Sequence, residues 1–136
     1  MSDSTPIGAV TATLGEGYST DLSVRAHAFR ADEPLKDGGR DAGPTPVELL
    51  LASLASCTAI TVRMYADRKE FPVREINAVA MRTDSGKGKL ESVKVVLSLS
   101  GEVSDEQRQR ILEVSKKCPV HQTLSAGVNI ETVMED

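Results

Sequence analysis

The sequence predicts an α+β fold in which antiparallel β hairpins pack with a long buried central helix and a second helix. Two regions of alternating apolar and polar residues, each interrupted by a turn, predict the hairpins. Between them, no charged residue occurs from Leu49 to Val62, which predicts one long buried helix. A second helix pattern and a short final strand (127–133) follow. The chain of 136 residues is expected to form a single domain, residues 1–136.

The first hairpin is expected from two alternating segments, residues 8–14 and residues 19–29, with a glycine-rich turn between them. Because strand side chains alternate between faces, Arg25 and His27 are expected on one face of the second strand. The following segment, residues 31–45, is rich in charge, glycine and proline. It is expected to be a loop that either links two elements or covers a site.

The central helix has a clear start in the sequence. Thr45 suits the N-cap, Pro46 the first helical position and Glu48 the third, which together form a capping box. The helix is expected to run to about Lys69, with Cys57 near its middle. A helix that is apolar on most faces is buried on most faces. A single chain of this length has little to cover it with, so we expect a homodimer.

A second hairpin and a second helix are expected after the central helix. Residues 73–83 and residues 90–100 alternate with period two and predict a second hairpin. A second capping box at Ser104 opens a second helix. Pro119 is expected to stop that helix directly after Cys118.

Composition argues against two classes of partner. A net charge of −4, no basic run and no Trp argue against nucleic acid. Met1 to Gly8 lack the basic and apolar regions of a signal peptide. The uncharged stretch 49–62 is too short to span a bilayer and contains Ser and Thr, so no membrane partner is expected.

Two cysteines, Cys57 and Cys118, are candidates for a thiol redox site. The expected compartment is the cytoplasm, where cysteines are reduced or catalytic rather than permanently disulfide-bonded. A thiolate that attacks a peroxide becomes a sulfenic acid, and a second thiol condenses it to a disulfide. The alternatives are a small apolar core residue for Cys57 and an ordinary helix-end residue for Cys118. Four zinc ligands are not evident, so no metal site is expected.

Two cysteine-containing regions resemble a known family. Residues 43–52 (GPTPVELLLA) lead into residues 55–59 (ASCTA), and residues 117–121 (KCPVH) follow later. With the order of elements, these segments make the chain similar to the OsmC/organic hydroperoxide resistance (Ohr) family, as an OsmC-like divergent branch. The similarity covers nearly the whole chain.

The resemblance implies an activity and an assembly. Family members are intertwined homodimers with two sites at the subunit interface, and they reduce organic hydroperoxides. Cys57 matches the peroxidatic cysteine and Cys118 the resolving cysteine. An arginine and a glutamate set the thiolate, and no metal, haem or flavin cofactor is needed. A dithiol, in some members a lipoylated protein, restores the reduced enzyme.

Three further residues are candidates for supporting Cys57. Burial opposes ionisation of a thiol, so a cation is needed nearby, and Arg25 and Arg40 are both candidates. Glu48 lies nine residues before Cys57, whereas the family glutamate lies ten before, where this chain has Val47. Nine residues turn a helix by about 900°, which places Glu48 opposite Cys57. Glu48 is therefore either a helix cap or a catalytic group that serves the neighbouring subunit.

The function expected is thiol-dependent reduction of organic hydroperoxides through Cys57 and Cys118, in defence against oxidative stress. Two alternatives remain open. One is a non-catalytic protein that binds a small apolar ligand, and the other is a redox sensor whose disulfide alters a partner contact. An enzyme should consume one thiol pair per peroxide, whereas a binder should leave both thiols titratable.

Overall fold

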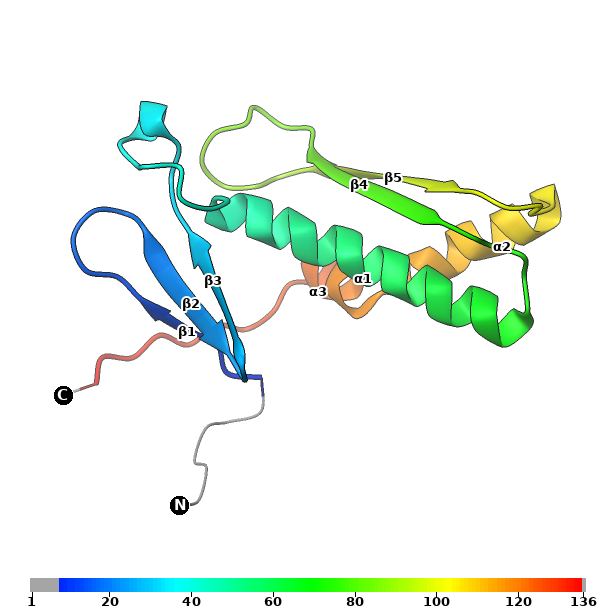
Figure 1. Cartoon of the computed structure of the whole chain (residues 1–136), viewed down its shortest axis with the longest axis horizontal. Coiled ribbons are helices and arrows are strands. Elements are labelled where there is room, and N and C mark those ends of the chain that lie inside the picture. The colour runs from blue at the N-terminus through cyan, green and yellow to red at the C-terminus, as the bar shows by residue number, and fades with distance from the viewer. Residues whose placement is uncertain (1–7, 136) are drawn as a thin grey trace, which may run out of the picture. The chain divides into compact units, whose positions relative to one another are not determined.

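The computed structural model describes residues 8–135. Its elements, in chain order, are β1 (Thr11–Thr13), β2 (Thr20–Val24), β3 (His27–Ala31), the 3-10 helix η1 (Leu35–Asp37), α1 (Pro46–Lys69), β4 (Ile76–Arg82), β5 (Val93–Leu99), α2 (Asp105–Ser115) and α3 (Pro119–Ala126) (Figure 1). Antiparallel strands and a long central helix confirm the α+β fold. The residues considered for a signal peptide lie, apart from Gly8, outside the described part.

The chain divides into two compact units, and the boundary falls inside α1, between Leu50 and Leu51. We call them the N-terminal unit and the C-terminal unit. The N-terminal unit holds β1 to β3 and the loop that leads into α1. The C-terminal unit holds most of α1 and everything after it. The single domain over residues 1–136 stays a prediction.

The N-terminal sheet has the order β1-β2-β3, with every neighbouring pair antiparallel. The single strand expected over residues 19–29 was wrong, because the chain turns back at Arg25 and Ala26 so that Val24 pairs with His27. Arg25 has a φ of 52°, as a two-residue hairpin turn requires. The usual Gly or Asn signal is missing there, so the pattern alone did not reveal the turn.

The loop expected over residues 31–45 is organised around the buried carboxylate of Asp32. Asp32 accepts backbone hydrogen bonds from Glu33 at 2.7 Å, Ala42 at 3.1 Å and Arg40 at 3.3 Å. Burial raises the pKa of Asp32, but these three bonds and the charge of Arg40 outweigh it, so the pKa is lowered overall. The loop therefore has a conformation fixed by hydrogen bonds to Asp32, contains η1, and is more than a linker.

Helix α1 begins and ends where the sequence predicts. Thr45 N–H donates to Glu48 Oε1 at 2.8 Å, and Glu48 N–H donates to Thr45 Oγ1 at 3.1 Å, which is the expected capping box. After Lys69 the chain leaves the helix through Glu70, which has a φ of 57°.

The expectation that α1 is buried on most faces is not met within one chain. Its buried residues form a single stripe: Leu54, Thr58, Val62, Tyr65 and Ala66. On the opposite face Ile60 is 55% exposed and Met64 is 67% exposed. This exposed face is apolar, and no described residue of the C-terminal unit covers it.

By length and composition alone, α1 could cross a membrane. Its best 18-residue window has a mean hydropathy of 1.5, and only 17% of that window is buried. The expectation from the sequence rested on the length of the uncharged stretch 49–62 alone, whereas the helix in the structure has 24 residues. A core helix of a soluble protein passes the same test.

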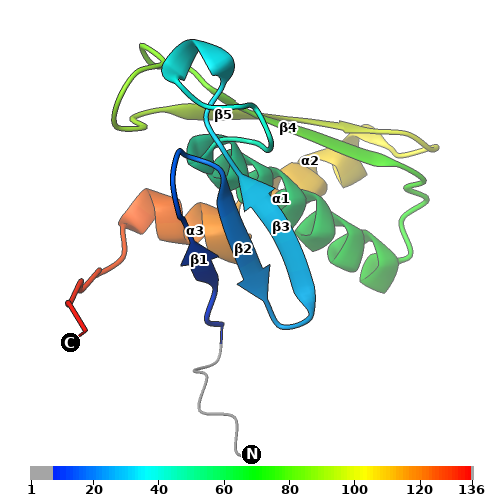
Figure 2. The ribbon, with the colours of Figure 1, turned by 60° about the vertical axis from the view of Figure 1, so that its left-hand side comes forward.

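In the C-terminal unit, β4 and β5 form an antiparallel hairpin in which Val79 pairs with Val96. The second predicted hairpin is thereby confirmed. Its inward face packs against α1 and α2, and the three helices lie on the same side of the hairpin (Figures 1 and 2). The core centres on Val62 and Ile111, both with no exposed surface.

The β4–β5 connection is held by an ion pair between Arg82 and Asp84. The Asp84 carboxylate also accepts backbone hydrogen bonds from Glu91 and Gly86, among others. These bonds, Glu91 first, hold the pKa of Asp84 far below its usual range. The Arg82 guanidinium donates in turn to three carbonyls of the same loop.

The region around Pro119 differs from expectation. Helix α2 opens with the predicted capping box at Ser104 but ends at Ser115, and Pro119 starts a further helix, α3. Cys118 is therefore the N-cap of α3 rather than the last residue of α2. Proline suits the first position of a helix as well as the position after one. Pro119 therefore marks the start of α3 and not the end of α2.

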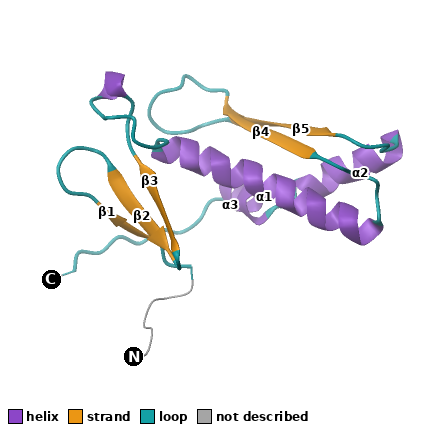
Figure 3. Cartoon of the chain, viewed as in Figure 1, coloured by secondary structure: helices purple, strands orange, loops and turns teal. Residues whose placement is uncertain are grey.

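The final strand expected over residues 127–133 is also wrong. These residues follow α3 as irregular chain, drawn as a loop in Figure 3. Val128 and Ile130 are 67% and 82% exposed. The alternating pattern is present, but no strand within residues 8–135 pairs with it, and an unpaired segment forms no ladder.

Candidate thiol site

The two cysteines lie on different elements of the C-terminal unit. Cys57 is in the middle of α1, and Cys118 is the N-cap of α3. Both are free thiols. Cys57 is half-buried, whereas Cys118 has no exposed surface. The fold thus brings together two residues that are 61 positions apart in the sequence.

The surroundings of the Cys118 thiol oppose its ionisation. Burial raises the pKa of Cys118, and a side-chain hydrogen bond to Cys57 raises it further. Backbone N–H groups of His121 and Val120 act in the opposite direction. The pair is therefore asymmetric, because Cys118 is fully buried and its pKa is raised, whereas Cys57 is the more exposed thiol.

His121 links the thiol pair to α3. Its backbone N–H donates to the Cys118 sulfur at 3.4 Å, and its ring Nδ1 lies 3.4 Å from the Ser125 hydroxyl. The half-buried ring of His121 lines a pocket of the C-terminal unit. His27, by contrast, is an exposed strand residue of the N-terminal unit.

Glu48 is occupied at the start of α1. Its carboxylate accepts the Thr45 N–H, so it acts as the capping residue there. It lies nine residues before Cys57 on one continuous helix, which turns by about 900° over that distance. A role for Glu48 in catalysis stays a prediction.

The candidate cations differ in their surroundings. Arg25 is exposed in the β2–β3 turn. The backbone N–H of Arg40 donates to the Asp32 carboxylate, and the charge of Arg40 lowers the pKa of Asp32. Both belong to the N-terminal unit, and their role beside Cys57 stays a prediction. Arg63, which is on the same helix as Cys57, binds the segment after that helix. Its guanidinium donates to the Val73 carbonyl at 3.0 Å and to the Arg74 carbonyl at 2.7 Å.

Sequence reasoning missed α3 and the buried carboxylate of Asp32. The Cys-Pro dipeptide at residue 118 could have revealed the helix start, since Pro favours the first helical position. Nothing in the local pattern distinguishes Asp32 from the other acidic residues of its loop. Within residues 8–135, no group of three His, Cys, Asp or Glu side chains is placed to hold a metal ion.

Several solved structures are similar in fold. A protein described as an osmotic stress induced and detoxification response protein from Psychrobacter arcticus matches with a TM-score of 0.76 and 18% identity, over 88% of this chain and 89% of that one. An OsmC-like protein from Mycoplasma pneumoniae matches with a TM-score of 0.74 and 23% identity, over 86% of each chain.

A Vibrio cholerae structure, described as an organic hydroperoxide resistance protein with captopril bound in one of its active sites, has a TM-score of 0.62. Its identity is 19%, over 90% of this chain and 88% of that one. No curated protein matches the chain. The model of the OsmC-like protein family matches residues 38–133, which include both cysteines. The chain therefore belongs to the OsmC-like protein family, as the motifs around Cys57 and Cys118 indicate.

Proposed function

We propose that this protein reduces organic hydroperoxides with Cys57 and Cys118 as its redox pair. The observation that carries the proposal is that two free thiols, far apart in sequence, are neighbours in one compact unit. Proteins similar in fold are described as hydroperoxide resistance proteins, which supports the same activity.

The difference between the two thiols supports one assignment of their roles. The attacking sulfur must be accessible to the peroxide and must ionise, and the thiolate is the nucleophile. Cys57 is the more exposed thiol, whereas Cys118 is buried and burial raises its pKa. Cys57 is therefore the peroxidatic residue and Cys118 the resolving residue.

The cycle has three steps. The Cys57 thiolate attacks the terminal peroxide oxygen, the O–O bond breaks, and protonation yields an alcohol and a sulfenic acid on Cys57. The Cys118 sulfur then bonds to the Cys57 sulfur, and water leaves with the sulfenic oxygen. A dithiol reductant, free or lipoylated, takes up the disulfide by exchange and is itself oxidised to a disulfide. No cofactor is needed, and the cytoplasm supplies the reducing conditions.

The assembly proposed for this activity is a homodimer that covers the exposed face of α1. Ile60 and Met64 lie on that face, opposite the buried stripe that packs on the chain's own hairpin. Contiguous apolar surface of this kind marks an interaction site. A second copy of the chain also explains α1 without a membrane.

Counting thiols after peroxide addition tests the function. The reduced protein is mixed with less than one equivalent of cumene hydroperoxide, and residual thiols are titrated after denaturation. We expect two thiols to be lost for each hydroperoxide consumed, with an intramolecular disulfide found by peptide mapping. If both thiols stay titratable, the non-catalytic ligand-binding alternative replaces the peroxidase.

A further inference from the structure

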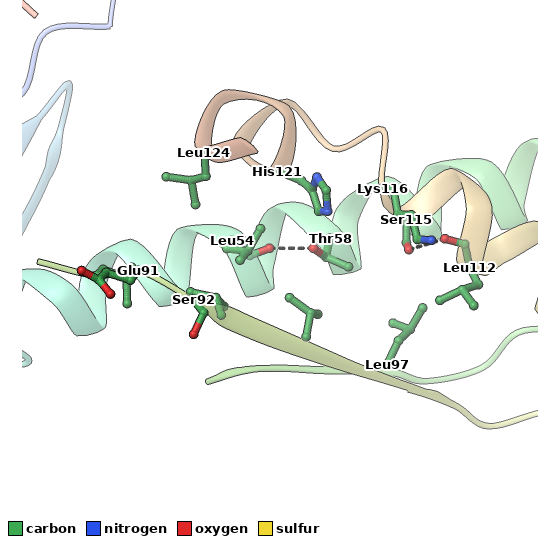
Figure 4. Close-up of a pocket in the computed structure, with 13 residues that line it drawn as sticks. Leu54, Thr58, Glu91, Ser92, Leu97, Leu112, Ser115, Lys116, His121 and Leu124 are labelled. Atoms are coloured by element: carbon green, nitrogen blue, oxygen red, sulfur yellow. Dashed lines mark hydrogen bonds between the residues drawn. The ribbon is translucent and has the colours of Figure 1, made fainter. Parts of the chain in front are cut away.

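A pocket of about 350 Å³ lies in the C-terminal unit, between α1, β5 and the helices α2 and α3 (Figure 4). Leu54 of α1, Leu97 of β5, Leu112 of α2 and Leu124 of α3 each contribute to its wall. This volume lies within the range of small-molecule binding sites. Neither Cys57 nor Cys118 lines the pocket, so it is separate from the thiol pair.

The two hydroxyl groups on the helical walls of the pocket have no free hydrogen. Thr58 donates its hydroxyl hydrogen to the Leu54 carbonyl at 2.8 Å, and Ser115 donates its own to the Leu112 carbonyl at 2.7 Å. The wall between the two ends is therefore mainly aliphatic, with the His121 ring as its polar side chain. Such a surface accepts a hydrocarbon chain and excludes a polar head group, which has to lie at an end.

The two ends carry opposite charges. Glu91 and Ser92 lie at one end of the view in Figure 4, and Lys116 lies toward the other with Ser115. Lys116 is exposed and has no ion-pair partner within residues 8–135.

Two adjacent lysines favour an anion at the Lys116 end. Lys116 is the C-cap of α2 and Lys117 follows it directly, so two positive charges lie between the negative end of the α2 dipole and the positive end of the α3 dipole, which begins at Pro119. At the other end, the Glu91 carboxylate repels an anion.

We propose that this pocket binds an amphiphilic monocarboxylate, with the carboxylate at Lys116 and the alkyl chain along the four leucines. The site uses the buried face of α1 through Leu54 and Thr58, which is opposite the face proposed for the dimer. The inference does not rest on the peroxidase, because binding at this site involves no change at either sulfur.

Isothermal titration calorimetry with three probes of equal chain length tests the proposal. Decanoate, decanol and decyltrimethylammonium are each titrated below their micelle concentrations into the full chain. The titrations use the double variant Cys57→Ser, Cys118→Ser, so that failure of the redox chemistry cannot affect the result. We expect one decanoate per chain and weaker binding of the alcohol and of the cation.

Two neighbouring lysines supply a matched pair of variants. Lys116→Gln should weaken decanoate binding about three- to fivefold, the scale of one exposed ion pair, and leave decanol binding unchanged. Lys117 does not line the pocket, so Lys117→Gln should weaken decanoate binding clearly less than Lys116→Gln does. Equal effects of the two variants, or tightest binding of the cation, would overturn the assignment.

A third variant locates the alkyl chain. Leu112 is 44% exposed on α2, so Leu112→Trp enlarges a pocket-wall side chain without entering the core. It should weaken decanoate and decanol binding alike, while far-UV circular dichroism stays unchanged. If both probes bind the folded variant as before, the ligand lies elsewhere and the proposal is wrong.

Discussion

The backbone N–H of His121 donates to the sulfur of Cys118 at 3.4 Å, so one sulfur atom both caps α3 and belongs to the thiol pair. A capping side chain satisfies a backbone donor that the helix itself leaves unpaired. Formation of a Cys57–Cys118 disulfide acts on the same atom. The start of α3 is therefore the part of the structure that most directly senses the oxidation state of the pair.

Substitutions at Cys118 should separate its capping role from its redox role. Cys118→Ser keeps a capping oxygen, whereas Cys118→Ala removes the acceptor of the His121 N–H. We expect the alanine variant to be about 1 kcal/mol less stable than the serine variant, the usual scale of a lost N-cap. Denaturant unfolding of both reduced variants measures the difference. Equal stabilities would show that the sulfur contributes nothing as a cap.

A substitution at Glu48 distinguishes a capping role of this residue from a catalytic role. Because Gln also accepts the Thr45 N–H, Glu48→Gln should retain most peroxidase activity and lose no more than about 1 kcal/mol of stability. Rates with cumene hydroperoxide and denaturant unfolding check the two expectations. A rate at least tenfold lower, in a variant that is stably folded, would instead assign Glu48 to the catalytic machinery. Val47→Ala, one residue away, serves as the control.

The start of α1 shows what local sequence can predict. Thr45, Pro46 and Glu48 identify the first turn because each acts within that turn, and the structure has the helix from Pro46 to Lys69. The second hairpin is predicted for the same reason, since its alternation and its turn are local features. Both cysteine segments led to the correct family.

Features that depend on distant contacts could not be predicted. The turn at Arg25 requires a positive φ that no Gly or Asn announces, and β2–β3 pairing imposes it. Residues 127–133 alternate like a strand, yet a strand needs a partner, which pattern alone does not supply. That Cys118 lies beside Cys57 likewise follows only from the packing of α1 with the α2–α3 junction.

The ion pair and hydrogen bonds of Asp84 should make the free energy of unfolding depend on pH. Its folded pKa is lowered, so its contribution is present above the usual value of 3.8 and is lost as pH falls toward the folded pKa. Asp84→Asn should therefore destabilise the protein clearly at neutral pH, and the difference from wild type should shrink in acid. Denaturant unfolding across this range measures it. Glu102 is an exposed carboxylate before α2, and Glu102→Gln serves as the control, which should show no such trend. If Asp84→Asn lowers the free energy of unfolding by the same amount at every pH, the role of the Asp84 carboxylate is refuted.

The exposed face of α1 gives a prediction about assembly. Light scattering at micromolar concentration should give twice the mass of one chain. Met64→Glu places a charge on the apolar face and should shift the protein toward the monomer, because an unpaired buried charge is costly. Gln122→Glu, an exposed change on α3, should leave the dimer intact. A wild-type protein at monomer mass would contradict the proposed cover of α1.

The most direct test of the central claim follows single turnovers in the two cysteine variants. With cumene hydroperoxide and a dithiol reductant, Cys118→Ser should form one equivalent of alcohol rapidly and then stall, with a trappable sulfenic acid on Cys57. Cys57→Ser should form no alcohol, because Cys118 is buried and burial raises its pKa, so it cannot replace the attacking thiolate. Equal steady-state rates in wild type and both variants would contradict the Cys57–Cys118 mechanism.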